Sequence, residues 1–228
     1  MEKPLSAYDR AILELEQQIV RLGEYVATGV SQALEALKQQ DVILARQVIE
    51  GDQVTDDWNY AIEEKVLELI SLQQPLDQDL RTLATALRVG RELERIGDYA
   101  VNIAEIAVRL ADKGPYFKPL VDIPRMSQLA QAMLHKSLNA FLSRSLSVAR
   151  EVIAADDEVV RLFEALYEEL IGYMKKGAQY VDQASYLSLV ARYLERIADH
   201  AVNIAEMVIF RETGIRRSLR DSQEQGEA

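Results

Sequence analysis

A fifteen-residue segment of this chain occurs twice. RELERIGDYAVNIAE, over residues 91–105, and RYLERIADHAVNIAE, over residues 192–206, agree at 12 of 15 positions. A weaker match lies upstream, where ARQVI at 45–49 resembles AREVI at 149–153. The first pair is offset by 101 residues and the second by 104, so the second copy has lost three residues, which we expect around Pro75. Because the matches recur in the same order, the sequence predicts a tandem duplication.

Both copies are predicted to be helical. Helix-forming residues such as Ala, Leu, Glu and Arg dominate, whereas the 228 residues include 10 glycines and 5 prolines. Apolar residues at steps of three and four begin soon after Ser6. Asp41 and Asp52 stand where each could cap a helix. The expected helices run over about 6–39, 41–51, 52–72 and 77–111, then from about 126, from about 156, and over about 182–211.

Three prolines mark the middle of the chain, at Pro115, Pro119 and Pro124. Proline restricts its own backbone and that of the residue before it, so a helix does not continue through such a stretch. We therefore predict an all-α protein in four parts. These are a first repeat over 1–112, a Pro-rich linker over 113–125, a second repeat over 126–213, and a flexible polar tail over 214–228.

Charge and composition argue against several classes of protein. The formal net charge of -11 argues against nucleic-acid binding, which requires a positive face. The chain has no cysteine, which excludes thiolate catalysis and thiolate metal sites. Without a Gly-x-Ser-x-Gly elbow or a P-loop, we predict no catalytic residue and no enzyme activity. No apolar run approaches the ~20 residues of a transmembrane helix, and no signal peptide is recognisable, so we expect a soluble, cytoplasmic protein.

The duplicated segments carry an acidic stripe. At 100° per residue, five polar side chains of each copy fall within one arc of the helix. They are Arg91, Glu94, Asp98, Asn102 and Glu105, and then Arg192, Glu195, Asp199, Asn203 and Glu206. Such residues usually form the solvated face of an amphipathic helix. However, both copies keep the same residues in the same order, and Glu94 and Asp98 are four apart, where like charges repel.

The alternative explanation of the stripe is cation binding. Carboxylates one turn apart can hold iron, manganese or magnesium, usually together with acids of a neighbouring helix. Asp52 and Asp56 supply such a pair, although Asp52 could equally be an N-cap. In the second copy Asp156 matches Asp52, but Val160 stands in place of Asp56. The candidate ligands of an iron or other divalent or trivalent metal cluster are Asp52, Asp56, Glu94, Asp98, Asp156, Glu195 and Asp199.

The repeated signature resembles that of the PhoU family of phosphate-signalling accessory proteins. LERIGDYAVNIAE, LERIADHAVNIAE, VIEGD and ISLQQPLDQDLR carry the resemblance, which covers nearly the whole chain. It implies two tandem, pseudo-symmetric three-helix bundles with spectrin-like repeats, in a cytoplasmic and often homodimeric protein. It also implies negative regulation of phosphate uptake and starvation signalling, in which the protein couples the ATPase subunit of a phosphate ABC transporter to a sensor histidine kinase. Peripheral membrane association would then come through these partners.

The same resemblance bears on metal binding. Some PhoU proteins bind multinuclear iron or other metals through Glu/Asp-x-x-x-Asp motifs. The matching residues here are Glu94 with Asp98, Glu195 with Asp199, and the helper acids Asp52, Asp56 and Asp156. Val160 departs from the acid expected in the second copy. Our leading hypothesis is a regulatory adaptor without chemistry of its own, and the alternative is a carboxylate-bridged metal-binding protein or metalloenzyme.

The remaining unusual residues have simpler explanations. Neither His135 nor His200 follows a Glu at the three-residue spacing of di-iron oxidases, and His200 matches Tyr99 in the first copy. We expect Trp58 in the core. The basic residues near the end could touch a membrane surface or an acidic partner, but a solvated tail beside the negative end of the last helix is the simpler interpretation. They are Arg211, Arg216, Arg217 and Arg220.

Overall fold

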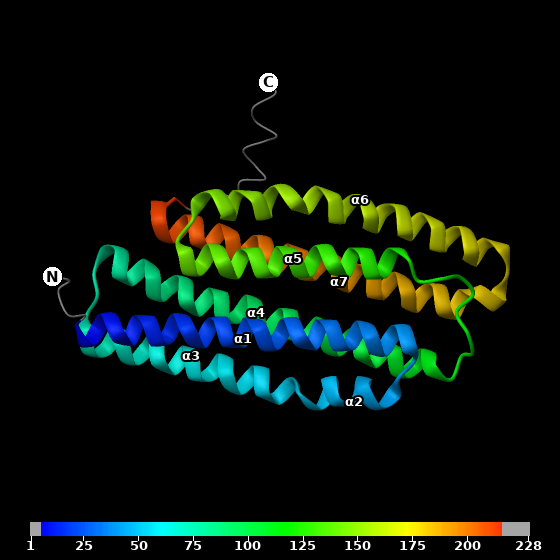
Figure 1. The fold of residues 1–228 in the computed structure, drawn as a ribbon, viewed down its shortest axis with the longest axis horizontal. Helices are drawn as coiled ribbons and strands as arrows, with labels where there is room; N and C mark the ends of the chain where they lie inside the picture. Colours follow the sequence, from blue (N-terminus) through cyan, green and yellow to red (C-terminus); the bar gives the residue numbers. More distant parts are fainter. Residues whose placement is uncertain (1–5, 216–228) are drawn as a thin grey trace, which may run out of the picture.

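A computed structural model describes residues 6–215 of the chain (Figure 1). These residues form seven α-helices and one short 3-10 helix, without a strand. The α-helices are α1 (Ala7–Gln39), α2 (Val42–Glu50), α3 (Asp52–Gln73), α4 (Asp77–Ala111), α5 (Asp122–Ser143), α6 (Leu146–Lys176) and α7 (Val181–Thr213), and η1 (Ala178–Tyr180) directly precedes α7. The all-α, duplicated fold predicted from the sequence is confirmed.

Each repeat is a three-helix bundle. In the first, α1 and α3 pack against α4, and the short helix α2 extends the row of α3 (Figure 1). In the second, α5 and α6 pack against α7. The bundles join along α4 and α7, which run in opposite directions, and α1 also packs against α5. One continuous cluster of buried apolar side chains therefore extends through both repeats.

The second repeat has one long helix where the first has two. Gly51 separates α2 from α3, and its counterpart at the offset of 104 is Ala155, which lies inside α6. We expected a helix to begin near Asp156, but α6 begins ten residues earlier and is capped by the hydroxyl of Ser145. This prediction was wrong because alanine, unlike glycine, favours continuation of a helix.

The three-residue difference between the repeats lies in the loop before their last helices. At the offset of 101, the first three residues of α4 correspond to Ala178–Tyr180, which form η1 instead of the first turn of α7. At the offset of 104, the end of α3 at Gln73 corresponds to Gly177. The residues without a counterpart are therefore 74–76, the loop that contains Pro75, where the sequence placed the loss.

The connection between the repeats is shorter than predicted and is fastened to the core. Helix α5 begins at Asp122 rather than near 126, so Pro124 lies in its first turn, where a missing N–H costs nothing. Gln183 of α7 holds the connection: its amide oxygen accepts from Phe117 N at 3.2 Å, and its amide nitrogen donates to the Pro115 carbonyl at 3.2 Å. At the other end of the molecule, the predicted tail lies outside the described residues from position 216 onwards.

Candidate functional site

The four candidate acids of the first repeat converge at the crossing of α3 and α4. Glu94 is buried, with 8% of its surface exposed, and Asp52, Asp56 and Asp98 are half-buried. Burial raises the pKa of Asp52 above its usual value, and the negative charges of Asp56 and Asp98 add to this effect. The pKa of Glu94 is raised by burial first and then by Asp98, against the opposing effect of the neighbouring arginines. These mutual electrostatic effects indicate that the four acids lie near one another.

Two arginines neutralise this cluster from the same helix. Arg91 Nη1 lies 3.0 Å from Glu94 Oε2. Arg95 bridges both acids, with Nη1 2.9 Å from Asp98 Oδ2 and Nε 3.7 Å from Glu94 Oε2. Both carboxylates of the motif are therefore already paired with guanidinium groups.

The second repeat reproduces this arrangement almost atom for atom. Arg192 Nη1 lies 3.2 Å from Glu195 Oε1, and Arg196 Nη1 lies 3.1 Å from Asp199 Oδ2. Burial raises the pKa of Glu195, with further contributions from Asp199 and Asp156, so Asp156 also faces this cluster. Asp156 is itself buried, at 6% exposed.

The second cluster is less acidic than the first. Val160 occupies the position of Asp56 and is half-buried on α6. The second repeat therefore has three candidate acids, against four in the first.

Two glycines bring α3 close enough to α4 for the acids to meet. A Cβ at Gly97 would lie 3.0 Å from Thr55 Cγ2, and a Cβ at Gly90 would lie 2.8 Å from Asn59 Oδ1. Their spacing of seven residues puts both on the face of α4 that α3 crosses. We did not predict this role. The signal was present, because glycine inside a helix costs about 1 kcal/mol relative to alanine and is retained where close approach requires it.

A buried carboxylate oxygen in each cluster lacks a hydrogen bond. Among the described residues, neither Glu94 Oε2 nor Glu195 Oε2 has a hydrogen-bond partner, although a guanidinium nitrogen lies 3.0 Å from the first and 3.8 Å from the second. Burying a polar oxygen without a hydrogen bond is unfavourable, so each such atom is a candidate ligand. Within residues 6–215, however, no group of three or more carboxylate or imidazole side chains is already arranged to hold a metal ion.

The acidic stripe seen in the sequence divides into parts with different roles. Glu94 and Asp98 face α3, whereas Asn203 of the second stripe points to the other repeat, where its amide donates to Glu92 Oε2 at 2.9 Å. Glu105 is exposed to solvent. The solvated-face interpretation therefore holds for the end of the first stripe but not for its buried acids.

Two predictions about single residues were wrong. Trp58, which we expected in the core, is 38% exposed at the outer surface of α3. Arg211, which we expected in a solvated basic tail, has no exposed surface. The other three arginines of that predicted tail, Arg216, Arg217 and Arg220, lie outside the described residues.

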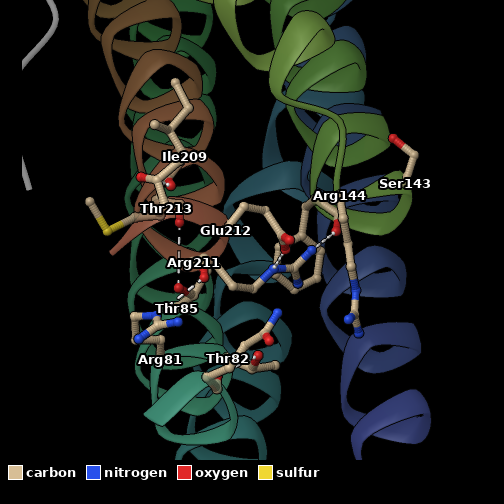
Figure 2. Close-up of polar contacts among 12 residues, drawn as sticks. Arg81, Thr82, Thr85, Ser143, Arg144, Ile209, Arg211, Glu212 and Thr213 are labelled. Carbon is tan, nitrogen blue, oxygen red and sulfur yellow. Dashed lines mark hydrogen bonds and ion pairs between the residues drawn. The ribbon is translucent and has the colours of Figure 1, made fainter. Parts of the chain in front are cut away.

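Arg211 is the centre of a buried polar network between the repeats (Figure 2). Its Nη1 lies 3.1 Å from Glu16 Oε1 of α1, and its Nη2 donates to the Phe141 carbonyl of α5 at 2.6 Å. The guanidinium carbon also lies 4.8 Å from the centre of the Phe141 ring. Glu212 pairs with Nε at 3.0 Å, and Figure 2 shows its carboxylate pointing at the guanidinium. One side chain thus links α7 to both α1 and α5.

The comparisons with known proteins agree with this architecture. The PhoU domain matches residues 19–107 and 123–208, one copy for each repeat. The chain is 34% identical over 216 residues to a "phosphate-specific transport system accessory protein PhoU homolog" of Clostridium acetobutylicum, covering 94% of this chain and 98% of that protein. It is 35% identical over 213 residues to a homologue of the same name from Caulobacter vibrioides, covering 93% of each protein.

Two solved structures share the fold. The crystal structure of PhoU from Pseudomonas aeruginosa superposes with a TM-score of 0.88 at 29% identity, over 91% of this chain and 100% of that one. The phosphate transport system regulatory protein PhoU from Streptococcus pneumoniae superposes with a TM-score of 0.85 at 29% identity, over 92% and 99% of the two chains. Both repeats are therefore covered in sequence and in structure.

Proposed function

The chain belongs to the PhoU family, and from this membership we propose that it is an accessory protein of phosphate-specific transport that represses phosphate uptake and phosphate-starvation signalling. The observation that carries the proposal is the similarity of both repeats to an accessory protein of phosphate-specific transport, over 94% of the chain. We further propose that the protein acts at the cytoplasmic face of the membrane as a helical adaptor, binding the ATPase subunit of a phosphate ABC transporter and a sensor histidine kinase.

Exposed apolar side chains at one end of the first repeat support an adaptor. In the described part of the chain, no helix is long and apolar enough to cross a membrane. Large apolar side chains are nevertheless exposed where α3 turns into α4: Leu72 is 67% exposed and Leu76 is 78% exposed. Exposed apolar side chains of this size are common at surfaces that bind other proteins. Figure 1 shows this turn at one end of the first bundle, beside the start of α1.

Deletion of the gene tests the regulatory role. We expect uptake of phosphate and alkaline phosphatase activity to rise in phosphate-rich medium, and a plasmid copy of the wild-type gene to restore repression. A copy carrying Leu76→Glu should restore it only partly, with Ile43→Glu, at an equally exposed site of α2, as the matched control. Unchanged uptake and phosphatase activity after deletion would contradict the proposal.

A binding experiment tests the adaptor role separately. The purified protein should retain the transporter ATPase subunit and the kinase in a pull-down, and phosphate concentration should change the amount retained. Formation of a homodimer can be measured on the same sample by light scattering. Retention of neither partner at either phosphate concentration would contradict the adaptor role, even if the regulatory role holds.

Metal binding is a second candidate function, favoured by the buried carboxylate oxygens that lack hydrogen bonds. Oxygen ligands of this kind suit iron, manganese or magnesium. We propose that Asp52, Asp56, Glu94 and Asp98 would supply the ligands in the first repeat, after Arg91 and Arg95 have released the carboxylates of Glu94 and Asp98. The second repeat, with Asp156, Glu195 and Asp199, would bind more weakly because Val160 supplies no oxygen.

Elemental analysis of purified protein tests the metal proposal. Glu94→Ala with Asp98→Ala should lower the bound metal more than Glu195→Ala with Asp199→Ala, because the first cluster has one more acid. Equal metal content in the wild type and both double variants would refute the proposal. Turnover of a phosphoester or of oxygen by the metal-loaded protein would favour the metalloenzyme over the adaptor.

A further inference from the structure

A groove lies between α1 and α3 on the outer surface of the first repeat, away from the acidic cluster. It has a volume of about 300 Å³ and is lined by Gln18 and Arg21 of α1 and by Trp58, Ala61 and Ile62 of α3. This volume is at the lower end of the range of small-molecule sites, which is roughly 300–1,000 Å³. None of these residues takes part in the contacts between the two repeats described above.

Trp58 offers a fixed aromatic surface in this groove. The residue is 38% exposed, although tryptophan is among the costliest residues to leave in water. Tyr25 packs against it with ring centres 5.6 Å apart. The Tyr25 hydroxyl is in turn anchored by donating to the Gly51 carbonyl at 3.1 Å. The indole is therefore held in place from one side, while another part of its surface lines the groove.

Arg21 brings a positive charge that no described residue neutralises. Within residues 6–215 its guanidinium has neither a hydrogen bond nor an ion pair, whereas Arg91 and Arg95 on α4 are both paired with acids. A guanidinium presents a planar fork of donors that matches phosphate and carboxylate oxygens. The groove is thus suited to an anionic group.

Gln18 adds a hydrogen-bonding group with no partner at the same place. Its Oε1 is buried and, among the described residues, has no hydrogen-bond partner. Such an atom is unfavourable in a folded protein unless a donor reaches it. A ligand with an N–H group would supply this donor. An amide side chain is also the group that pairs with both N6 and N7 of adenine.

We propose that this groove binds an adenine nucleotide. The base stacks on Trp58, the exocyclic amine donates to Gln18, and the phosphate accepts hydrogen bonds from Arg21. A nucleotide combines an aromatic ring, an N–H donor and a negative charge in one small molecule. The ring would meet the exposed part of Trp58, and the donor and the charge would meet Gln18 and Arg21, which have no partner among the described residues. The site is independent of the acidic clusters and of the function proposed above.

The proposal can be tested directly by fluorescence, because Trp58 is the only tryptophan of the chain. Adenosine monophosphate added to the full-length protein should change tryptophan emission to saturation. Adenosine should bind about tenfold more weakly, since it lacks the charge-assisted contact with Arg21. Guanosine monophosphate should also bind more weakly, since its O6 and N7 are both acceptors. Inorganic phosphate alone should produce no saturable change.

Three variants assign the contacts. Arg21→Gln should remove the difference between the nucleotide and adenosine, and Gln18→Leu should remove the preference for adenine over guanine. Trp58→Phe keeps a smaller ring, and equilibrium dialysis should show binding weakened by about tenfold, in line with the contribution of base stacking. Arg150→Gln, an exposed position on α6, is the matched control for the loss of one positive charge. Circular dichroism melting checks that each variant is folded.

Several outcomes would overturn the proposal. One is the absence of nucleotide binding by both fluorescence and dialysis at millimolar concentration. A second is equal affinity of the wild type and the Arg21→Gln and Trp58→Phe variants, which would place the nucleotide elsewhere. A third is a saturable change with inorganic phosphate of the same affinity, which would identify a simple anion site.

Discussion

His200 Nδ1 lies 2.6 Å from Glu92 Oε2, across the boundary between the two repeats. The residues at the same positions of the other repeat, at the offset of 101, are Tyr99 and Tyr193, and their rings stack with centres 5.7 Å apart. Tyr99 and His200 also contact each other, with ring centres 5.6 Å apart. The same two positions of the repeat therefore make a polar contact in one case, between Glu92 and His200, and an aromatic contact in the other, between Tyr193 and Tyr99.

This relationship predicts that two substitutions can give both sides of the interface the same Tyr–Tyr contact. His200→Tyr alone should destabilise the protein by about 1 kcal/mol, because Glu92 loses a hydrogen-bonded partner at a half-buried site. Glu92→Tyr alone should have a similar cost. The double variant would place a second Tyr–Tyr pair opposite the first, and it should be more stable than either single variant. Urea unfolding of the four proteins measures the coupling, and strictly additive effects would contradict the pairing.

The buried ion pair of Arg211 with Glu16 gives a second prediction. Arg211→Met should destabilise the protein by about 3–5 kcal/mol, because it leaves the Glu16 carboxylate buried beside only the more distant Arg144. Adding Glu16→Leu should recover a large part of that loss, since apolar pairs replace buried ion pairs well. Glu212→Gln, which changes the outer partner of Arg211, is the control and should cost less than about 1 kcal/mol. The free energy of unfolding in urea is the measurement.

The helices and the first acidic cluster could be predicted from the sequence because both depend on local spacing. The 3.6-residue period placed α1 and α4, and it put Glu94 and Asp98 on one face. The burial of Arg211 could not be predicted in this way, since it depends on α1 and α5, which are distant in sequence, meeting the end of α7. Trp58 was misplaced for a related reason: composition predicts a buried tryptophan, whereas α1 covers only part of its ring.

The raised pKa of Glu94 predicts a pH-dependent stability. Burial lifts this pKa above its usual 4.5, so the unfolded chain releases the proton more readily than the folded protein does. The stability contributed by protonated Glu94 is therefore present below pH 4.5 and is lost as the pH rises through the folded-state pKa. Glu94→Gln, which is always neutral, should be more stable than the wild type at pH 7, and this advantage should shrink as the pH falls through the folded-state pKa of Glu94 toward 4.5.

Urea unfolding between pH 4 and pH 7 measures this difference. Glu105→Gln, at an exposed position of the same helix, is the matched control for the loss of one negative charge. A Glu94→Gln variant that is less stable than the wild type at pH 7 would show that the ion pair with Arg91 outweighs the cost of burial. In that case the cluster would be a structural salt bridge rather than a strained acidic site.

The close crossing of α3 and α4 leads to a prediction about two glycines that lie inside helices, Gly97 and Gly172. Gly97→Ala should destabilise the protein by about 1–3 kcal/mol, because its Cβ would meet Thr55 Cγ2, and β-branched threonine cannot easily turn away. Thr55→Ser removes that methyl group, so Gly97→Ala should cost less in a Thr55→Ser background.

Gly172 of α6 is the control, because no described atom lies within 4 Å of an added Cβ. Gly172→Ala should therefore stabilise the protein by about 0.5–1 kcal/mol through helix propensity alone. If both alanines stabilised equally in thermal or urea unfolding, glycine at position 97 would not be needed for the approach of the two helices.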